Sequence, residues 1–483
     1  MSLRLRSSRC LSVLACLLAS CGGAGAPGAT TQTAQSPEIR FTLRPSPASL
    51  AELSVEACYD AIPFSTTPAL AHIRDVERSD GGDPLLVSPE GSVDLRPLDS
   101  GDCIRYVADL PADGQLSFGG AEAGYWMGPP SLLLVIPHTA PRDTPVAITW
   151  EGPSDDVATF SSLRREGEQW RANVAAIRSA ALVGWGRGFG QDGASAGGGA
   201  LEWTLLPGSE WPVETVSAWL GDALRGASSV LGRFPYETFS MVVVPVDEPP
   251  SPVVFDYLVP GTGGVALVRV DRSLGAGELR EHGAALLEML RLGMPVMTDD
   301  LWLTEGILAY YREIVGARLG YQSKNDAFRH LHVMLGSFQA RRDRPSDSDM
   351  SELLPSERGA EKGVAFALIA DVAFRARGTS LDERLSAAFG EASARNAIHS
   401  ADAVIAALDA GLEEPVAGPA ARAIRSGAAS AELDAAYQRL ALTPKRRGRL
   451  SLRGRSDGSA LRTAITSAPP PAAEEAVAAA ESP

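Results

Sequence analysis

The spacing of apolar residues changes near residue 213, and this change constrains the fold more than any other feature of the chain. Over residues 38–185, apolar and polar residues alternate in short runs such as 39–43 and 103–107, which Gly, Pro, Asp and Ser separate. A period of two is typical of strands with one buried face, and many short strands predict an antiparallel β-sandwich. The glycine-rich residues 186–212 predict a linker.

Beyond this linker, apolar residues recur every three or four positions, as in residues 213–231, where Val216, Leu220 and Leu224 fall near one helical face. The apolar, β-branched run 235–245 predicts a buried strand. Further helices are predicted at 278–293, 300–317, 323–340, 361–377, 382–390, 400–411 and 418–440. The sequence therefore predicts an α+β multidomain chain, with a β-rich part followed by a mainly helical part.

The N-terminal residues are typical of an export signal. Three arginines precede the apolar residues 11–18, which are too few to span a bilayer and predict a signal peptide over residues 1–20. The letters Leu-Ala-Ser-Cys-Gly that end at Gly22 resemble the lipobox of bacterial lipoproteins, in which the cysteine is acylated. The resemblance implies a lipid on Cys21, a membrane anchor in the cell envelope and, because Gly22 is not Asp, the outer membrane. An ordinary secretory signal with a chance cysteine is the alternative.

The polar residues 21–37 have no apolar periodicity and predict a flexible tether. Only Cys58 and Cys103 then remain as thiols in the mature chain, and two thiols in an oxidising compartment most simply form a disulfide. Two buried free thiols are the alternative to this pairing. We expect the disulfide to be structural.

The charge of the chain bears on its partners. The formal net charge is -15, and nucleic acid is not an expected partner because phosphate backbones are bound by clustered Lys and Arg. The tail at residues 443–483 has a basic part followed by a Pro/Ala/Glu part and is predicted to be disordered. Its basic part could contact anionic lipid or cell-wall polymer, but a solvated charge run is the favoured interpretation.

Residues 301–311 are the most informative for function. Their letters, Leu-Trp-Leu-Thr-Glu-Gly-Ile-Leu-Ala-Tyr-Tyr, resemble the glutamate helix of gluzincin metallopeptidases, the group of aminopeptidase N and the glycyl aminopeptidases. In that family this glutamate, here Glu305, is the third zinc ligand. The resemblance extends to residues 232–237 and 260–267, and it implies a thermolysin-like, mainly helical peptidase domain over residues 213–442.

The family's upstream H-E-x-x-H motif is degenerate in this chain. Counting back from Glu305 by the family spacing places the motif at 282–286, where His282 stands in register. Gly283 replaces the glutamate that activates water, and Leu286 replaces the second zinc-binding histidine. A catalytic zinc takes three protein ligands, and this register supplies only two, so His282 and Glu305 are expected to be vestigial ligands. We therefore expect that the protein binds no cofactor and has no catalytic residue.

A substitute metal site, with another side chain in place of the missing histidine, is conceivable from the helical spacing. Glu278 lies one helical turn before His282 and could join it and Glu305 as a zinc ligand, although a solvated helix-start acid is the favoured interpretation. The candidate cleft residues are Trp302, Tyr310, Tyr311, Gly263 and Gly264. For the two tyrosines, core packing is the usual alternative to a place in a cleft.

Three functions remain open. The favoured hypothesis is an inactive, membrane-anchored pseudopeptidase that binds a peptide or an envelope protein. The second is a divergent active zinc metallo-aminopeptidase that uses substitute ligands, and only this hypothesis requires zinc. The third is a structural envelope lipoprotein that acts through its surface.

Overall fold

The computed structural model describes most of the chain between residues 37 and 467. The gaps in this description are 47–49, 51, 61–72, 89–91, 111–117, 121–123, 153–156, 180, 250, 260–263, 282–288, 298–300, 343–354, 391–397, 446–448 and 453–456. The predicted signal peptide, Cys21 and nearly all of the predicted tether therefore lie outside the described residues. In the described part of the chain, no helix combines the length and the apolar character that crossing a bilayer would require.

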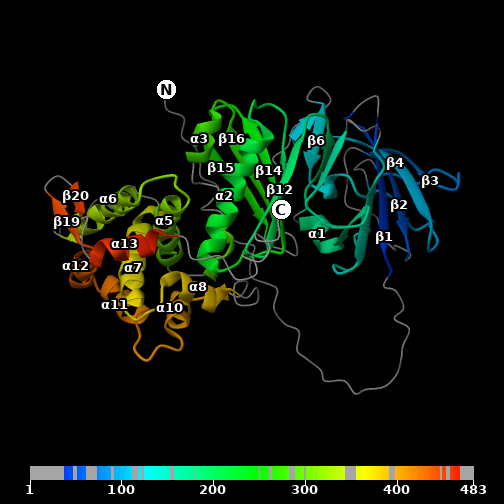
Figure 1. The fold of residues 1–483 in the computed structure, drawn as a ribbon. Helices are drawn as coiled ribbons and strands as arrows, with labels where there is room; N and C mark the ends of the chain where they lie inside the picture. Colours follow the sequence, from blue (N-terminus) through cyan, green and yellow to red (C-terminus); the bar gives the residue numbers. More distant parts are fainter. Residues whose placement is uncertain are drawn as a thin grey trace, which may run out of the picture. The chain divides into compact units, whose positions relative to one another are not determined.

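The first part of the chain forms two β-sheets (Figure 1). The seven-stranded sheet has the order β3-β4-β2-β1-β7-β10-β9 and contains β1 (Ile39–Pro45), β2 (Glu52–Tyr59), β3 (Ile73–Arg78), β4 (Cys103–Asp109), β7 (Pro145–Trp150), β9 (Arg164–Glu166) and β10 (Gln169–Asn173). The four-stranded sheet has the order β5-β6-β11-β8 and contains β5 (Phe118–Gly120), β6 (Tyr125–Gly128), β8 (Ala158–Ser161) and β11 (Val183–Gly186). All neighbours pair antiparallel except β1 and β7, which are parallel.

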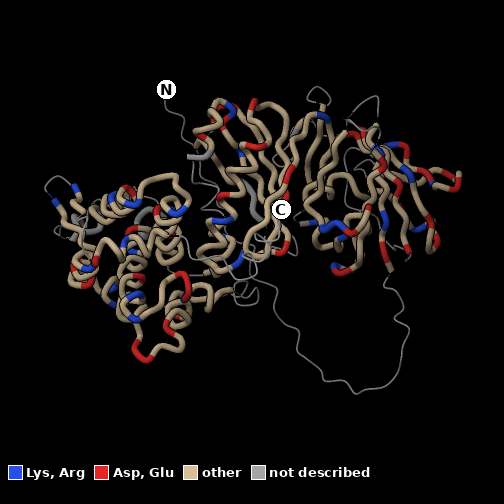
Figure 2. Tube along the Cα trace, viewed as in Figure 1, with Lys and Arg blue, Asp and Glu red and all other residues tan. Residues whose placement is uncertain are grey.

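The two sheets share one apolar core. Phe41 and Ile148 of the larger sheet belong to the same buried cluster as Trp126 and Trp185 of the smaller one. Alternate residues of β1, β2 and β4 are buried, as the period of two predicts. The other residues of these strands include arginines and carboxylates (Figure 2). Some of them pair across strands, such as Arg44 of β1 with Glu56 of β2. The turn helix η1 (Pro130–Leu132) and α1 (Val174–Ser179) complete this part.

A five-stranded sheet follows, with the order β12-β13-β14-β16-β15. It contains β12 (Gly190–Ala196), β13 (Gly199–Leu205), β14 (Thr238–Val246), β15 (Val253–Val259) and β16 (Gly264–Asp271). β13, β14 and β16 are parallel, whereas β12 and β15 join the two edges antiparallel. Helix α2 (Val213–Leu231) lies across this sheet (Figure 1) and shares its core.

The linker predicted for residues 186–212 is instead largely the β12–β13 hairpin. Gly197 and Gly198 turn between the strands with φ of 59° and 73°, a left-handed conformation that glycine adopts readily. β12 is an edge strand and carries almost no large apolar side chain, so its composition looks like that of a linker.

The remaining chain is mainly helical. Its helices are α3 (Ala276–Glu281), α5 (Trp302–Arg318), α6 (Lys324–Arg342), α7 (Pro355–Arg375), α8 (Leu381–Phe389), α10 (Ala401–Asp409), α11 (Ala417–Arg425), α12 (Ser430–Arg439) and α13 (Asp457–Thr466). Two short pairs of strands accompany them, β17 (Val296–Met297) with β18 (Ile398–His399) and β19 (Leu442–Lys445) with β20 (Arg449–Leu452). The helix predicted at 418–440 is split into α11 and α12, because Gly427 reverses the chain at φ 73°.

The tail from residue 443 differs from the predicted disorder over much of its described length. β19, β20 and α13 form there, and Ile465 of α13 is fully buried. Buried Arg462 donates a hydrogen bond to the Leu440 carbonyl at the end of α12. The charge-rich composition of this segment concealed the few apolar residues that attach it to the helical core. The Pro/Ala/Glu part at 469–483 lies outside the described residues.

Candidate functional site

Glu305 lies in the first turn of α5, on the segment that resembles the glutamate helix. Its neighbours Leu303 and Ile307 are buried, whereas the Glu305 side chain is partly exposed. Gly306 faces Gly363 of α7 at a close crossing of the two helices. The apolar residues therefore fix α5, and Glu305 projects from a rigid support.

The Glu305 carboxylate is bound by a guanidinium. Arg291 Nη1 donates to Oε1 at 2.6 Å, and Arg291 Nη2 donates to Oε2 at 3.1 Å. This two-point geometry is the one that arginine and carboxylate groups prefer. Both carboxylate oxygens are thus engaged by a fixed positive charge, which would also repel a metal cation approaching from that side. A zinc ion at Glu305 would therefore have to compete with this ion pair.

Four of the sequence-predicted site residues lie in gaps of the described chain. His282, Gly283 and Leu286 lie outside the described residues, as does Gly263. Within the described residues, no group of three or more His, Cys, Asp or Glu side chains is arranged to hold a metal ion.

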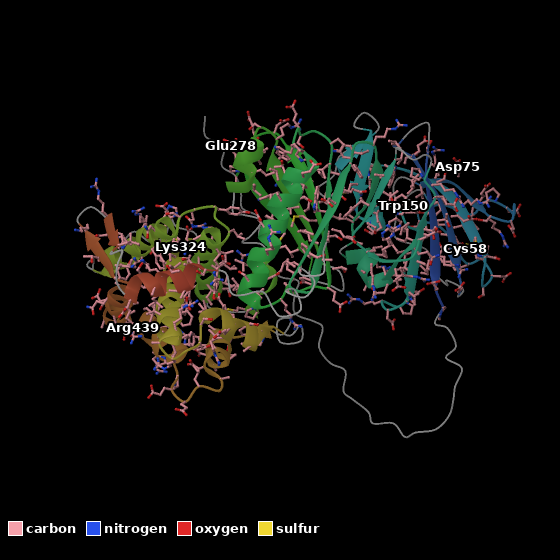
Figure 3. All side chains as sticks on the ribbon, in the orientation of Figure 1. Cys58, Asp75, Trp150, Glu278, Lys324 and Arg439 are labelled. Atoms are coloured by element: carbon pink, nitrogen blue, oxygen red, sulfur yellow. A yellow bond between two sulfur atoms is a disulfide. The ribbon has the colours of Figure 1, made fainter. Side chains whose placement is uncertain are left out.

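Glu278, the conceivable substitute ligand, caps its own helix. Its Oε2 accepts a hydrogen bond of 2.7 Å from the Gly275 backbone N–H, just before α3 (Figure 3). The side chain is exposed. A carboxylate that binds an N–H at a helix start is satisfied there without a metal.

Tyr310 and Tyr311 lie in the core of the helical part rather than on a cleft. Both side chains are fully buried, and burial raises the pKa of each phenol well above its ordinary value. Tyr310 donates a hydrogen bond of 2.7 Å to Asp371 Oδ2 on α7. Gly264 is also buried, and it packs so closely on Phe239 that an added Cβ would lie 2.5 Å from the Phe239 ring.

Trp302 is the candidate cleft residue that remains partly exposed. Its ring meets Phe366 edge to face at 5.9 Å, and the Arg425 guanidinium carbon lies 6.0 Å from the ring centroid. The second contact is within cation–π range. Trp302 thus packs on α7 with one face and supports a cation with its ring.

A buried charged cluster lies at the C-terminal end of α5 and was not predicted from the sequence. Arg318 on α5 donates to both oxygens of Asp382, at 3.2 and 2.8 Å, and to the Ile465 carbonyl at the end of α13. Burial raises the pKa of Asp382. The cluster joins α5, α8 and α13, and we assign it to stability because buried charges require partners.

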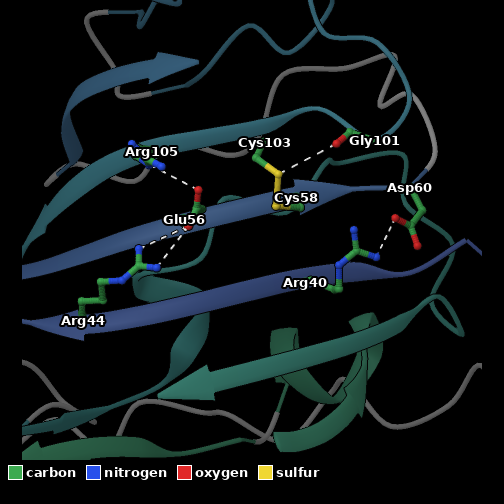
Figure 4. Close-up of a disulfide and its surroundings, with 8 residues drawn as sticks. All are labelled: Arg40, Arg44, Glu56, Cys58, Asp60, Gly101, Cys103 and Arg105. Carbon is green, nitrogen blue, oxygen red and sulfur yellow. Dashed lines mark hydrogen bonds and ion pairs between the residues drawn. A yellow bond between two sulfur atoms is a disulfide. The ribbon is translucent and has the colours of Figure 1, made fainter. Parts of the chain in front are cut away.

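The Cys58–Cys103 disulfide is present, as predicted. The two residues stand directly opposite each other on β2 and β4, with their Cα atoms 4.0 Å apart (Figure 4). Near the bond, Glu56 of β2 pairs with Arg105 of β4 and with Arg44 of the neighbouring strand β1. These ion pairs and the disulfide tie neighbouring strands together, which is a structural role.

Comparison with solved structures shows which known proteins have a similar fold, whereas comparison of the sequence finds no match. No family model and no curated protein matches the sequence. The structure is similar to the crystal structure of an aminopeptidase N family protein from Idiomarina loihiensis, with a TM-score of 0.54 and 14% identity, over 84% of this chain and 78% of that chain. An M1 zinc metallopeptidase from Deinococcus radiodurans matches over 81% of this chain and 93% of that chain, with a TM-score of 0.41 and 15% identity.

The likeness to the Idiomarina protein carries the conclusion, and at this identity it concerns the fold alone. The chain has an M1 peptidase-like fold, in which a β-rich part precedes a mainly helical part.

Proposed function

We propose that this protein is a lipid-anchored protein of the cell envelope whose peptidase-like domain binds a peptide or a partner protein without hydrolysing it. The observation that carries the proposal is the two-point ion pair between Arg291 and Glu305. In an active gluzincin the carboxylate at this position would have to be available to zinc.

Three features act together against hydrolysis in this proposal. Arg291 engages the carboxylate of Glu305 and places a positive charge beside it. In the family register, Leu286 supplies no nitrogen ligand and Gly283 supplies no base to activate water. Restoring a metal site would therefore require the two missing side chains, and releasing Glu305 from Arg291 would strengthen it.

Zinc content tests this part of the proposal. The chain from Gly22 onward, which lacks the lipid anchor, would be analysed for bound metal as the natural sequence and as the Gly283→Glu, Leu286→His variant. A third form would add Arg291→Met, and a fourth would instead add Arg312→Met, because Arg312 also pairs with a carboxylate on α5. We expect zinc only in the repaired forms, and more of it when Arg291 is removed than when Arg312 is. Stoichiometric zinc in the natural protein would overturn the proposal.

An open sheet edge supports the binding part of the proposal. Among the described strands, β15 pairs on one side only, with β16. An extended peptide can add to such an edge through main-chain hydrogen bonds. Amide hydrogen exchange would therefore show protection of residues 253–259 when a peptide from the protein's own envelope is bound. Protection that appears only elsewhere would place the peptide at a different surface.

The anchor belongs to the same proposal. Residues 1–22 support acylation of Cys21 and, through Gly22, location in the outer membrane. A Cys21→Ser variant should appear in the soluble fraction, whereas the natural chain should fractionate with the outer membrane and carry a lipid detectable by mass spectrometry. We also infer that the two sheets over residues 38–185 form a sandwich, which their shared core supports.

A further inference from the structure

A cavity of about 760 Å³ lies in the helical part, between α7, the α12–β19 junction and α13. Its volume is in the range of about 300 to 1,000 Å³ that is usual for small-molecule sites. It is separate from Glu305. Arg375, which lines it, follows Gly363 by twelve residues on α7, which is about 18 Å along the helix from the crossing with Gly306.

The walls of this cavity are held firmly. Ala441, between α12 and β19, adopts a left-handed φ of 51°. A Cβ on Gly458 at the start of α13 would lie 2.6 Å from the Ala441 Cβ, so α13 packs directly on this residue. This close packing holds α13 against the α12–β19 junction on one side of the cavity.

The inner wall is apolar and contains one incompletely used guanidinium. Val372 and Leu442 are buried there. Arg375 donates through Nε to Asp371 and through Nη2 to Asp382, but its Nη1 has no hydrogen-bond partner among the described residues. A guanidinium carries five N–H donors, so Arg375 retains donors for a ligand.

The rim carries side chains of both charges. Arg439 (Figure 3) and Asp457 line the cavity, together with Gln438 and Thr443, and all four are exposed. In the described part of the chain, none of these four side chains forms a hydrogen bond or an ion pair. The cavity thus presents a cation, a carboxylate, an amide and a hydroxyl above an apolar wall.

We propose that this cavity binds a small zwitterion, namely a free amino acid or short peptide with an apolar side chain. Arg439 and Arg375 provide donors for its carboxylate, and Asp457 accepts from its ammonium group. The apolar side chain packs on Leu461 of α13, which lines the cavity and is only partly buried. A simple anion would leave Asp457 facing a like charge, and a simple cation would face two guanidinium groups.

Calorimetric titration of the chain from Gly22 onward with leucyl-leucine tests this proposal. Two further ligands, its N-acetyl and C-terminal amide derivatives, each lack one of the two charges. We expect the dipeptide to bind and each derivative to bind at least about tenfold more weakly. No saturation at about 20 mM dipeptide, or equal binding of all three ligands, would overturn the proposal.

Three variants locate the site. Arg439→Gln should weaken binding of leucyl-leucine at least about tenfold, and Ala376→Trp, which fills the cavity from an exposed wall position, should abolish it. The control is Arg422→Gln, which removes an exposed arginine of α11 outside the cavity and should leave the affinity unchanged. Melting temperatures within about 2 °C of one another would show that all three fold. Unchanged affinity in folded Ala376→Trp would refute the site.

Discussion

Gly306 on α5 and Gly363 on α7 bring two helix backbones into direct contact. A Cβ on Gly306 would lie 2.1 Å from the Gly363 Cα, and a Cβ on Gly363 would lie 2.1 Å from the Trp302 carbonyl oxygen. No side chain fits between them. The glycine that follows Glu305 is therefore required by packing, independently of any metal chemistry.

Gly363→Ala should destabilise the protein strongly, because the added methyl group can be accommodated only by separating α5 from α7. We expect a loss of about 2 to 4 kcal/mol, measured by urea unfolding. Gly336→Ala in α6 is the control, since no atom would lie within 4 Å of its added Cβ. The control should be neutral or gain up to about 1 kcal/mol from helix propensity. Equal effects of the two changes would contradict the close crossing.

Asp409→Ala should destabilise the start of α11. The Asp409 carboxylate accepts hydrogen bonds of 2.7 Å from the backbone N–H groups of Val416, Ala417 and Gly418. Its removal leaves three helix-start donors without their acceptor, and we expect a loss of about 2 kcal/mol in urea unfolding. Asp402→Ala, which removes an exposed acid paired with Arg425, should cost less than about 1 kcal/mol.

His332 should make stability depend on pH. It is buried on α6 with Nδ1 2.9 Å from the Tyr437 hydroxyl, and burial lowers its pKa below the ordinary value of 6.5. The unfolded chain therefore binds the proton more readily than the folded one. The contribution of this group is fully present above pH 6.5 and is lost as the pH falls from there through the lowered pKa of the folded state.

His332→Gln tests this dependence. The variant should lose less stability than the natural protein when unfolding free energies are compared between about pH 7.5 and 5. His138→Gln, a change at an exposed position, should follow the natural protein. If the unfolding free energies of the natural protein and of His332→Gln change equally with pH, His332 does not titrate in this way.

The Cys58–Cys103 disulfide should stabilise the β-rich part through its loop. The two cysteines are 45 residues apart, and closing a loop of this size stabilises by about 4 kcal/mol in the chain-entropy description. Cys58→Ser, Cys103→Ser should lower the urea midpoint to that of the reduced natural protein. The prediction fails if reduction leaves the midpoint of the natural protein unchanged.

The sequence predicted elements whose residues show a clear period. Residues 213–231 were identified to the residue, since the apolar stripe ends where Gly232 takes a φ of 72°. The coarse order, β-rich and then helical, was equally accessible. The spacing of apolar residues does not predict an edge strand that lacks apolar side chains, as in β12. It also does not predict a charged segment that only a few apolar residues attach to the core, as in α13.

The candidate site was harder to predict than the fold. Glu305 could be recognised from its local motif, but Arg291 could not be assigned to it. The two residues are 14 positions apart, and Arg291 lies in a separate helical stretch at 289–292. Only the fold brings the guanidinium to the carboxylate. The charged cluster around Arg318 was missed for the same reason, since its members come from helices distant in sequence.

Met127 and Phe160 of the β-rich part belong to the same buried cluster as Val242 and Val265 of the five-stranded sheet. Cutting the chain between the two parts would expose apolar surface on both, so neither is expected to be soluble alone. This also limits how such a protein can evolve. Recombination within residues 187–212 would join one of the two parts to a foreign partner whose apolar surface does not match it. The two parts should therefore be inherited together rather than exchanged as modules.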